Sequence, residues 1–280
     1  MNRPFSSLNR TECVSLMKRY PLSIGILAGQ WLKLGEYQQT LRALEQPVLH
    51  LDLMDGHFCP QFTVGPWAIA QLPQQIIKDV HLMVENPWPV VQASVKAGAH
   101  CVTLQVENTP HLHHMLHWLG EQNAEVSGGT MPVLRGISLC PATPLEHILP
   151  VIEDVEIVQI LAVNPGYGSK LSRSALLRRI AQVVALLNAS GKRDSILLAV
   201  DGSLTLEELP EIIASGVDRV VSGSALFRND ALAENTTRWL TTIHSAKGVE
   251  GAVGGRNLRD NLVEWAEIWE PERGDLLLKW

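Results

Sequence analysis

Apolar and polar positions follow two different periodicities along most of the chain. Short runs rich in Val, Ile and Leu are typical of strands buried on both faces. These runs occupy residues 23–28, 48–54, 78–84, 100–106, 133–139, 157–163, 195–200 and 219–222. Longer segments between them have apolar residues at helical spacing, at 34–44, 67–72, 87–97, 111–121, 144–152, 172–189, 206–215 and 229–243. The pattern predicts eight strand–helix pairs, as in a closed (β/α)8 TIM barrel, whose usual size is about 250 residues.

An open, doubly wound parallel sheet is the alternative arrangement of such elements. That sheet usually has a G-x-G-x-x-G turn after its first strand, and Gly25 and Gly29 do not form one. We therefore expect a single α/β barrel domain at 21–245. A short helical lead-in at 1–20 would precede it, and an extension at 246–280, charged with interspersed Trp and Leu, would follow.

The strand at 48–54, with the sequence VLHLDLM, is the most informative of the apolar runs. Side chains two residues apart lie on the same face of a strand, so His50 and Asp52 share one face and the leucines occupy the other. Burying a polar group without a partner costs about 2–7 kcal/mol, and burying a charge costs more. A hydrogen bond between the two side chains in the core would satisfy them, and so would a shared metal ion.

Further polar side chains occur where other strands are expected to end. His81 lies on the third predicted strand, and Asp201 directly follows the seventh. In TIM barrels the functional groups come from the carboxyl ends of the strands. Two His and two Asp side chains suit one divalent transition metal such as Zn, Fe, Mn or Co. We therefore predict a metal site formed by His50, Asp52, His81 and Asp201.

Glycine-containing turns follow the last three predicted strands. They are NPGYGS at 164–169, DGS at 201–203 and SGS at 222–224. Such turns let backbone N–H groups approach an anion, and the amino end of a following helix adds a favourable dipole. A phosphate site after the seventh and eighth strands recurs in this fold, so we predict that these turns bind a phosphate group.

A metal ion between two carboxylates points to a specific reaction. The ion can hold the vicinal oxygens of a ketose and stabilise an enediolate as it forms. Asp52 and Asp201 come from well separated strands and could flank one carbon atom. One carboxylate would remove a proton and the other would return one on the opposite face, which inverts a carbon next to a carbonyl.

Charge and composition narrow the class of partner. The net charge of −6 and a pI near 5.9 provide no electrostatic footprint for nucleic acid. No run of eighteen apolar residues and no signal-peptide core occur in the sequence. The four cysteines are scattered without a CxxC pair. We therefore expect a cytoplasmic protein that acts on a small molecule, with neither a nucleic-acid nor a membrane partner.

Six motifs occur in order along residues 23–227. They are GILAGQWLKLGE, LHLDLMDGHFCPQFTVGP, DVHLMVENP, LCPATPLE, AVNPGYGSK and VDGSLTLEELPEIIASGVDRVVSGSALF. In these motifs the chain resembles the ribulose-phosphate 3-epimerase family. The resemblance implies a TIM barrel of the ribulose-phosphate-binding type that self-associates, binds one divalent metal ion and interconverts ketose phosphates at C3 through a metal-bound enediolate.

The resemblance assigns roles to specific residues of this chain. The metal ligands are His50, Asp52, His81 and Asp201, and Asp52 and Asp201 are also the catalytic acid–base pair. The implied substrate contacts are Gly25, Met54, His81, Met83, Gly166, Tyr167, Gly168, Ser169, Gly202, Ser203, Gly223 and Ser224.

Several positions depart from the family's pattern. Gly25 stands where the family usually has a serine that contacts the substrate, and Leu161 replaces one of three methionines that cap the metal site. Ser203 replaces a usual glycine. Lys170 replaces a usual glutamine, and it could either direct a positive charge toward the phosphate or be solvated. No ligand or acid is lost, so we expect the reaction class to be kept while the pocket walls differ.

Three functions therefore compete. The first is an epimerase, with D-ribulose 5-phosphate as the default substrate and another keto-sugar phosphate, such as allulose 6-phosphate or an autoinducer-2-related phosphate, as the alternative. The chain is also similar to a branch of the family found with autoinducer-2 processing genes. The second is a lyase of the same fold, which would need a lysine in an Asp-x-Lys-x-x-Asp motif that is missing after Asp52. The third is a catalytically silent sugar-phosphate-binding protein.

Overall fold

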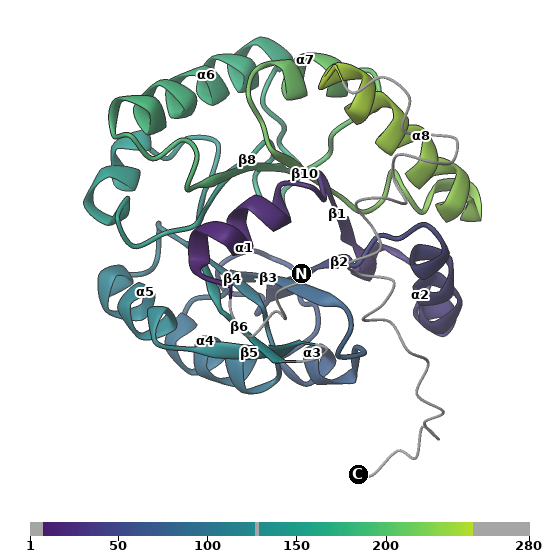
Figure 1. Cartoon of the computed structure of the whole chain (residues 1–280), viewed down its shortest axis with the longest axis horizontal. Coiled ribbons are helices and arrows are strands. Elements are labelled where there is room, and N and C mark those ends of the chain that lie inside the picture. The colour runs from purple at the N-terminus through teal and green to yellow at the C-terminus, as the bar shows by residue number, and fades with distance from the viewer. Residues whose placement is uncertain (1–7, 127–128, 249–280) are drawn as a thin grey trace.

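The computed structural model describes residues 8–126 and 129–248. Within these residues, eight parallel strands close into a barrel in the order β1-β10-β9-β8-β7-β4-β3-β2 (Figure 1). The barrel strands are β1 (Leu22–Gly25), β2 (Val48–Met54), β3 (Ile77–Met83), β4 (Cys101–Gln105), β7 (Leu134–Leu139), β8 (Ile157–Leu161), β9 (Leu197–Asp201) and β10 (Arg219–Ser222). The predicted TIM barrel is confirmed, and every predicted apolar run overlaps one of its strands.

Helices between the strands cover the outside of the barrel (Figure 1). They are α2 (Leu34–Ala43), α3 (Trp67–Gln71), α4 (Pro87–Lys96), α5 (Leu112–Gly120), η4 (Leu145–Val151), α6 (Arg173–Ala189), α7 (Leu209–Ala214) and α8 (Leu232–Ala246), and three short 3-10 turns η2 (Ile26–Ala28), η3 (Trp31–Lys33) and η5 (Arg228–Asp230) accompany them. The segment η4 is a 3-10 helix, and Pro150 inside it has no backbone N–H to donate. Helix α8 begins later than predicted because Asn229 and Asp230 have positive φ angles, which a helix does not tolerate.

An antiparallel hairpin between α5 and β7 is absent from the sequence prediction. Its strands are β5 (Asn123–Val126) and β6 (Gly129–Pro132). His100, at the entrance to β4, holds the hairpin to the barrel: its Nδ1 accepts the N–H of Lys78 at 3.1 Å, and its Nε2 lies 2.9 Å from the carbonyl oxygen of Glu125. Each strand of the hairpin has only four residues, which is too short for periodicity to reveal it.

Two hydrophobic clusters hold the barrel together. The larger one lies between the strands and the outer helices, and it includes the leucines of β2, as the alternation predicted. The smaller one fills the floor of the barrel, where the first residues of six strands meet: Val48, Ile77, Cys101, Leu134, Ile157 and Leu197.

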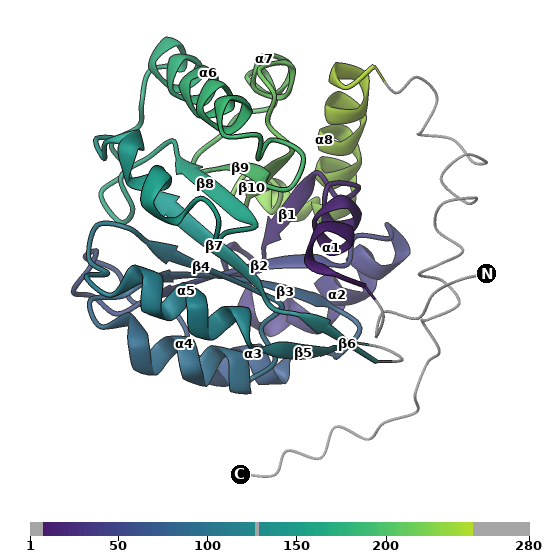
Figure 2. The same cartoon turned by 60° about the vertical axis from the view of Figure 1, so that its left-hand side comes forward.

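Helix α1 (Arg10–Met17) covers that floor (Figure 2). A capping box begins it: the Asn9 side chain accepts the N–H of Glu12, and the Glu12 carboxylate accepts the N–H of Asn9. Cys13, Val14 and Met17 pack into the floor cluster. The amino ends of the strands are thereby closed, and the carboxyl ends remain for the site.

The predicted extension at 246–280 lies outside the described residues from position 249 onward. The division into lead-in, barrel and extension remains a prediction. Within the described ranges, no helix combines the length and apolar character needed to cross a membrane.

Candidate active site

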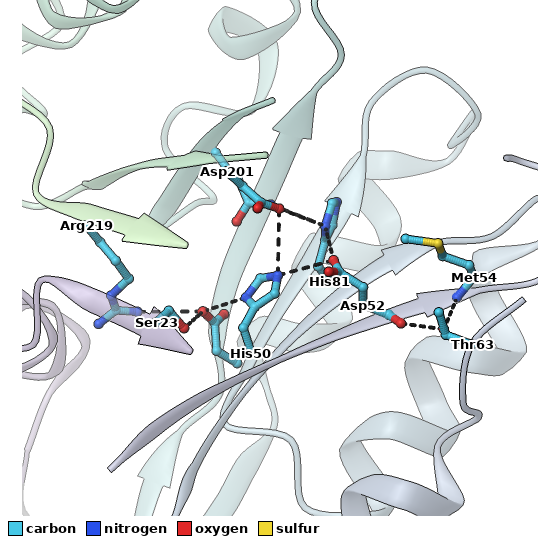
Figure 3. A network of polar contacts seen from close by, with 10 residues as sticks. Ser23, His50, Asp52, Met54, Thr63, His81, Asp201 and Arg219 are labelled. Carbon is cyan, nitrogen blue, oxygen red and sulfur yellow. Dashed lines mark hydrogen bonds and ion pairs between the residues drawn. The ribbon is translucent and has the colours of Figure 1, made fainter. Parts of the chain in front are cut away.

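The four predicted ligands meet at the carboxyl end of the barrel (Figure 3). His50 and Asp52 lie on β2, His81 on β3, and Asp201 is the last residue of β9. Asp52 and His81 are register partners across the β2–β3 pair, which places their side chains side by side. One nitrogen or carboxylate oxygen from each of the four residues lies within 4.8 Å of the other three. The sequence therefore identified a cluster that the fold does assemble.

Asp52 and Asp201 approach the two imidazoles from different sides of the barrel. Asp52 Oδ1 lies 3.0 Å from Nδ1 of His81 and 3.3 Å from Nε2 of His50. Asp201 Oδ2 lies 3.9 Å from each of the same two nitrogens. Both imidazoles are fully buried, whereas the Asp52 side chain is 29% exposed and the Asp201 side chain 15%. The carboxylates therefore form the part of the cluster that a small molecule can reach.

The donor set fits a divalent transition metal. Two imidazole nitrogens and two carboxylate oxygens converge on one point, and such mixed sets are typical of Zn, Fe, Mn or Co sites. The other nitrogen of His50, Nδ1, lies 3.0 Å from Oδ2 of Asp79. A carboxylate behind a ligating histidine fixes its tautomer and directs the opposite nitrogen at the metal, here Nε2.

The two carboxyl groups differ in proton affinity. Burial would raise the pKa of Asp52, but the charge of His50 and hydrogen bonds from His50 and His81 hold that pKa well below its usual range. Burial, reinforced by the charge of Asp52, raises the pKa of Asp201 to about 6. The site therefore contains one strongly acidic carboxyl group and one that can keep a proton near neutral pH, and such separation is typical of acid–base pairs.

Polar residues that the sequence prediction did not single out surround the cluster and support it. Asp79 and Ser23 stand behind His50, and Gln159 on β8 lies 3.2 Å from Nδ1 of His81 and 3.3 Å from Oδ2 of Asp201 through its Nε2. Asp79 shares a strand face with His81, two residues away, and this period-2 spacing could have revealed it. Gln159 gave no such signal, because it is a single polar residue in the apolar run IVQIL.

A pocket of about 680 Å³ opens over the cluster. Its lining includes three residues of the cluster, His50, Asp52 and Asp201, and seven of the predicted substrate contacts: Gly25, Gly166, Tyr167, Gly168, Ser203, Gly223 and Ser224. The other predicted contacts, Met54, His81, Met83, Ser169 and Gly202, are not part of this lining. Leu27, Ala28, Gln61, Val163, Asn164 and Val221, which the prediction did not name, complete the wall.

Two glycines of the turns predicted to bind phosphate occupy positions where a side chain does not fit. Gly202 has a φ of +107°, and a Cβ atom on it would lie 2.4 Å from the side chain of Val163. A Cβ on Gly223 would lie 2.9 Å from the Cβ of Ala28. A Cβ on Gly25 would lie 3.1 Å from the Cα of Gly223. The ends of β1 and β10 therefore approach each other closely, and Gly25 is part of that contact.

Residues 21–227 match the model of the ribulose-phosphate 3 epimerase family. The chain belongs to this family. It is 63% identical over 239 residues to "Putative epimerase LsrE" of Salmonella typhimurium, which covers 85% of this chain and 93% of that protein. It is 33% identical over 215 residues to ribulose-phosphate 3-epimerase of Bacillus subtilis, covering 75% and 94% of the two chains. The predicted family and enzyme class, an epimerase acting on sugar phosphates, are confirmed.

Solved structures with low sequence identity share the fold. Thiamine phosphate pyrophosphorylase from Pyrococcus furiosus superimposes with a TM-score of 0.52 at 14% identity, covering 84% of this chain and all of that one. At this identity the likeness supports the barrel architecture alone.

Proposed function

We propose that this family member inverts C3 of a ketose phosphate, with D-ribulose 5-phosphate to D-xylulose 5-phosphate as the default reaction. One observation supports the proposal most directly. Asp52 and Asp201 enter a single pocket from separate strands, beside two buried imidazoles, and the glycine turns 166–168 and 223–224 line the same pocket. A pocket of about 680 Å³ lies within the range of about 300–1,000 Å³ typical of small-molecule sites.

The metal site is part of the proposal. His50, Asp52, His81 and Asp201 would hold one divalent ion. Such an ion supplies positive charge that stabilises the negative charge developing on the substrate oxygens. Asp79 holds the imidazole of His50 so that Nε2 faces the ion site.

The protein residues divide the proton transfers between them. Asp52 stays ionised beside His50 and His81, which is the protonation state that a base needs to remove the C3 proton. Asp201, with its pKa raised to about 6, is suited to hold the proton that is delivered to the opposite face. The roles exchange in the reverse direction. The amide of Gln159 donates to Asp201 Oδ2 at 3.3 Å and holds that carboxyl group in place.

A larger or differently shaped keto-sugar phosphate is the second candidate substrate. The specific observation is Gly25, which lies in the pocket wall against Gly223 and presents no side chain to the pocket. A hexulose phosphate such as allulose 6-phosphate, or an autoinducer-2-related phosphate, would use the same carboxylates with a different fit at this wall.

We also expect the protein to be cytoplasmic and to form a homo-oligomer. Light scattering on the purified protein would test the oligomeric state.

Proton NMR in D2O tests the proposal. The metal-loaded protein is mixed with D-ribulose 5-phosphate, and deuterium entry at C3 and formation of xylulose 5-phosphate are followed. We expect both in the wild type, and a loss of at least about 100-fold in Asp201→Asn. Glu153→Gln, which changes an exposed carboxylate paired with Lys192, is the matched control and should retain activity.

The outcomes separate the candidates. Exchange without efficient turnover, or turnover with allulose 6-phosphate alone, would support the second candidate substrate. Absence of exchange with any ketose phosphate, in protein shown to contain metal, would refute the epimerase function and favour the catalytically silent binding protein.

A further inference from the structure

We propose that Arg219 is a positioning residue for the metal site, which joins helix α1 to the His50 ligand through Asp79. The proposal rests on the proposed function for its metal ion. It involves a helix outside the family-model match, because α1 (Arg10–Met17) lies before the matched residues 21–227. Figure 3 shows Arg219, Ser23 and His50 along one line of polar contacts that leads to Asp201.

Asp79 is the central group of this link. Its side chain is almost fully buried, and one oxygen, Oδ2, has three neighbours. The hydroxyl of Ser23 donates to it at 2.8 Å, Nδ1 of His50 lies at 3.0 Å, and Nη1 of Arg219 lies at 3.8 Å. A buried carboxylate requires a compensating positive charge, and the guanidinium of Arg219 is suited to provide it.

Arg219 is held in place by the end of α1. Its side chain is 1% exposed; Nη2 donates to the carbonyl of Met17 at 2.7 Å and Nε to the carbonyl of Tyr20 at 3.1 Å. Met17 is the last residue of the helix, where carbonyl groups lack helical partners and a cation is favourable. Among the described residues, Nη1 has no hydrogen-bond partner, and it is the nitrogen that faces Asp79.

The two ends of the link therefore depend on each other. Packing of α1 on the barrel floor fixes the carbonyls that orient Arg219, and Arg219 stabilises the charge of Asp79 behind His50. Without the guanidinium, Asp79 would be a buried charge facing only a hydroxyl and an imidazole. The cost of that arrangement is relieved when Asp79 moves away from this position, and that movement frees the His50 ring. We therefore expect metal affinity to depend on a residue that touches neither the metal ligands nor the substrate pocket.

The experiment measures Co²⁺ affinity by calorimetric titration of the metal-free protein. The variants are Arg219→Met, Arg219→Lys, Asp79→Asn and the double variant Asp79→Asn/Arg219→Met. Arg135→Met is the matched control, because Arg135 is also a largely buried arginine, paired with Glu156 at 2.6 Å on another part of the barrel. Urea unfolding of each metal-free variant is measured in parallel, and circular dichroism verifies that each is folded.

We expect Arg219→Met to weaken Co²⁺ binding at least about 10-fold, within the range of about 10–100-fold known for residues behind metal ligands. Arg219→Lys should recover part of the affinity, because it keeps the charge. Arg135→Met should lower stability and leave Co²⁺ affinity unchanged. The double variant should bind Co²⁺ no more weakly than Asp79→Asn alone, because Arg219 acts through Asp79.

Unchanged Co²⁺ affinity in a folded Arg219→Met, or additive losses in the double variant, would overturn the proposal. A wild type that binds no Co²⁺ would instead refute the metal part of the proposed function. The urea measurements would still test the contact between Asp79 and Arg219. Non-additive changes in the unfolding free energy across the Asp79–Arg219 double-mutant cycle support it, and additive changes refute it.

Discussion

The ammonium group of Lys170 lies 2.8 Å from the carboxylate of Glu208, and it also donates to the carbonyl of Ser203 at 2.8 Å. Lys170 follows β8 and Glu208 precedes α7, so the pair joins the two turns after β8 and β9. The sequence left open whether this lysine faces the phosphate or the solvent. The structure shows a third arrangement, in which its charge is engaged by Glu208 and it fixes the turn containing Ser203.

Lys170→Gln should therefore loosen this turn and leave the carboxylates of Asp52 and Asp201 in place. We expect the KM for a ketose phosphate to rise about 3-fold with kcat nearly unchanged, because a partly exposed ion pair contributes up to about 1 kcal/mol. Steady-state kinetics measures the effect. Lys192→Gln, which breaks the pair with Glu153 away from the pocket, is the control and should change neither constant. An equal fall in kcat would contradict the assignment.

Gly25 provides a test of substrate choice. In Gly25→Ser the new hydroxyl would project at the β1 wall, and a hydrogen bond to the substrate is worth about 0.5–1.5 kcal/mol. We expect kcat/KM for D-ribulose 5-phosphate to rise by up to about 10-fold relative to allulose 6-phosphate. Gly25→Ala adds the same Cβ atom, 3.1 Å from Gly223, without the hydroxyl. Equal effects of the two substitutions would show that the contact with Gly223, and not the hydroxyl, determines specificity.

Gln159 connects the His81 and Asp201 sides of the cluster. Gln159→Leu keeps the volume and removes the amide that lies 3.3 Å from Asp201 Oδ2. We expect metal affinity to fall about 10-fold, because loss of a group that orients a ligand typically costs that much or more. Titration with Co²⁺ measures the change. Gln105→Leu, an equally buried substitution on β4, should leave the affinity unaltered, and a similar fall there would point to general damage to the core.

His100 should make stability depend on pH. Burial lowers its pKa to about 4, from an ordinary value near 6.5. The folded protein therefore disfavours the protonated form, and the stabilisation is complete above pH 6.5. As the pH falls from about 6.5 to about 4, the unfolded chain takes up the proton first, so about 3 kcal/mol of the unfolding free energy is lost.

Urea unfolding across pH 4–8 measures this dependence. His100→Gln can accept the N–H of Lys78 and donate to the carbonyl of Glu125 without titrating. We expect a flatter stability profile for this variant between pH 6.5 and 4. Parallel profiles for the two proteins would show that His100 is not responsible.

The sequence by itself determined the barrel and the four residues of its cluster. Each barrel strand lies in a short run rich in apolar residues, because both of its faces are buried, and that signal is local. The cluster could be predicted because His50, Asp52 and His81 interrupt such runs at period 2 and Asp201 ends one. The order of the strands in the fold then places their carboxyl ends together.

Only the tertiary structure decided which groups support those residues. Ser23, Asp79 and Arg219 lie far apart in the sequence and meet because β1, β3 and β10 enclose the same interior. The direction of Lys170 likewise depends on where Glu208 arrives from the next turn. The hairpin β5–β6 was missed because its pairing depends on contacts rather than on periodicity. Partners of this kind are set by packing across strands, and a pattern along one strand has no information about what lies opposite.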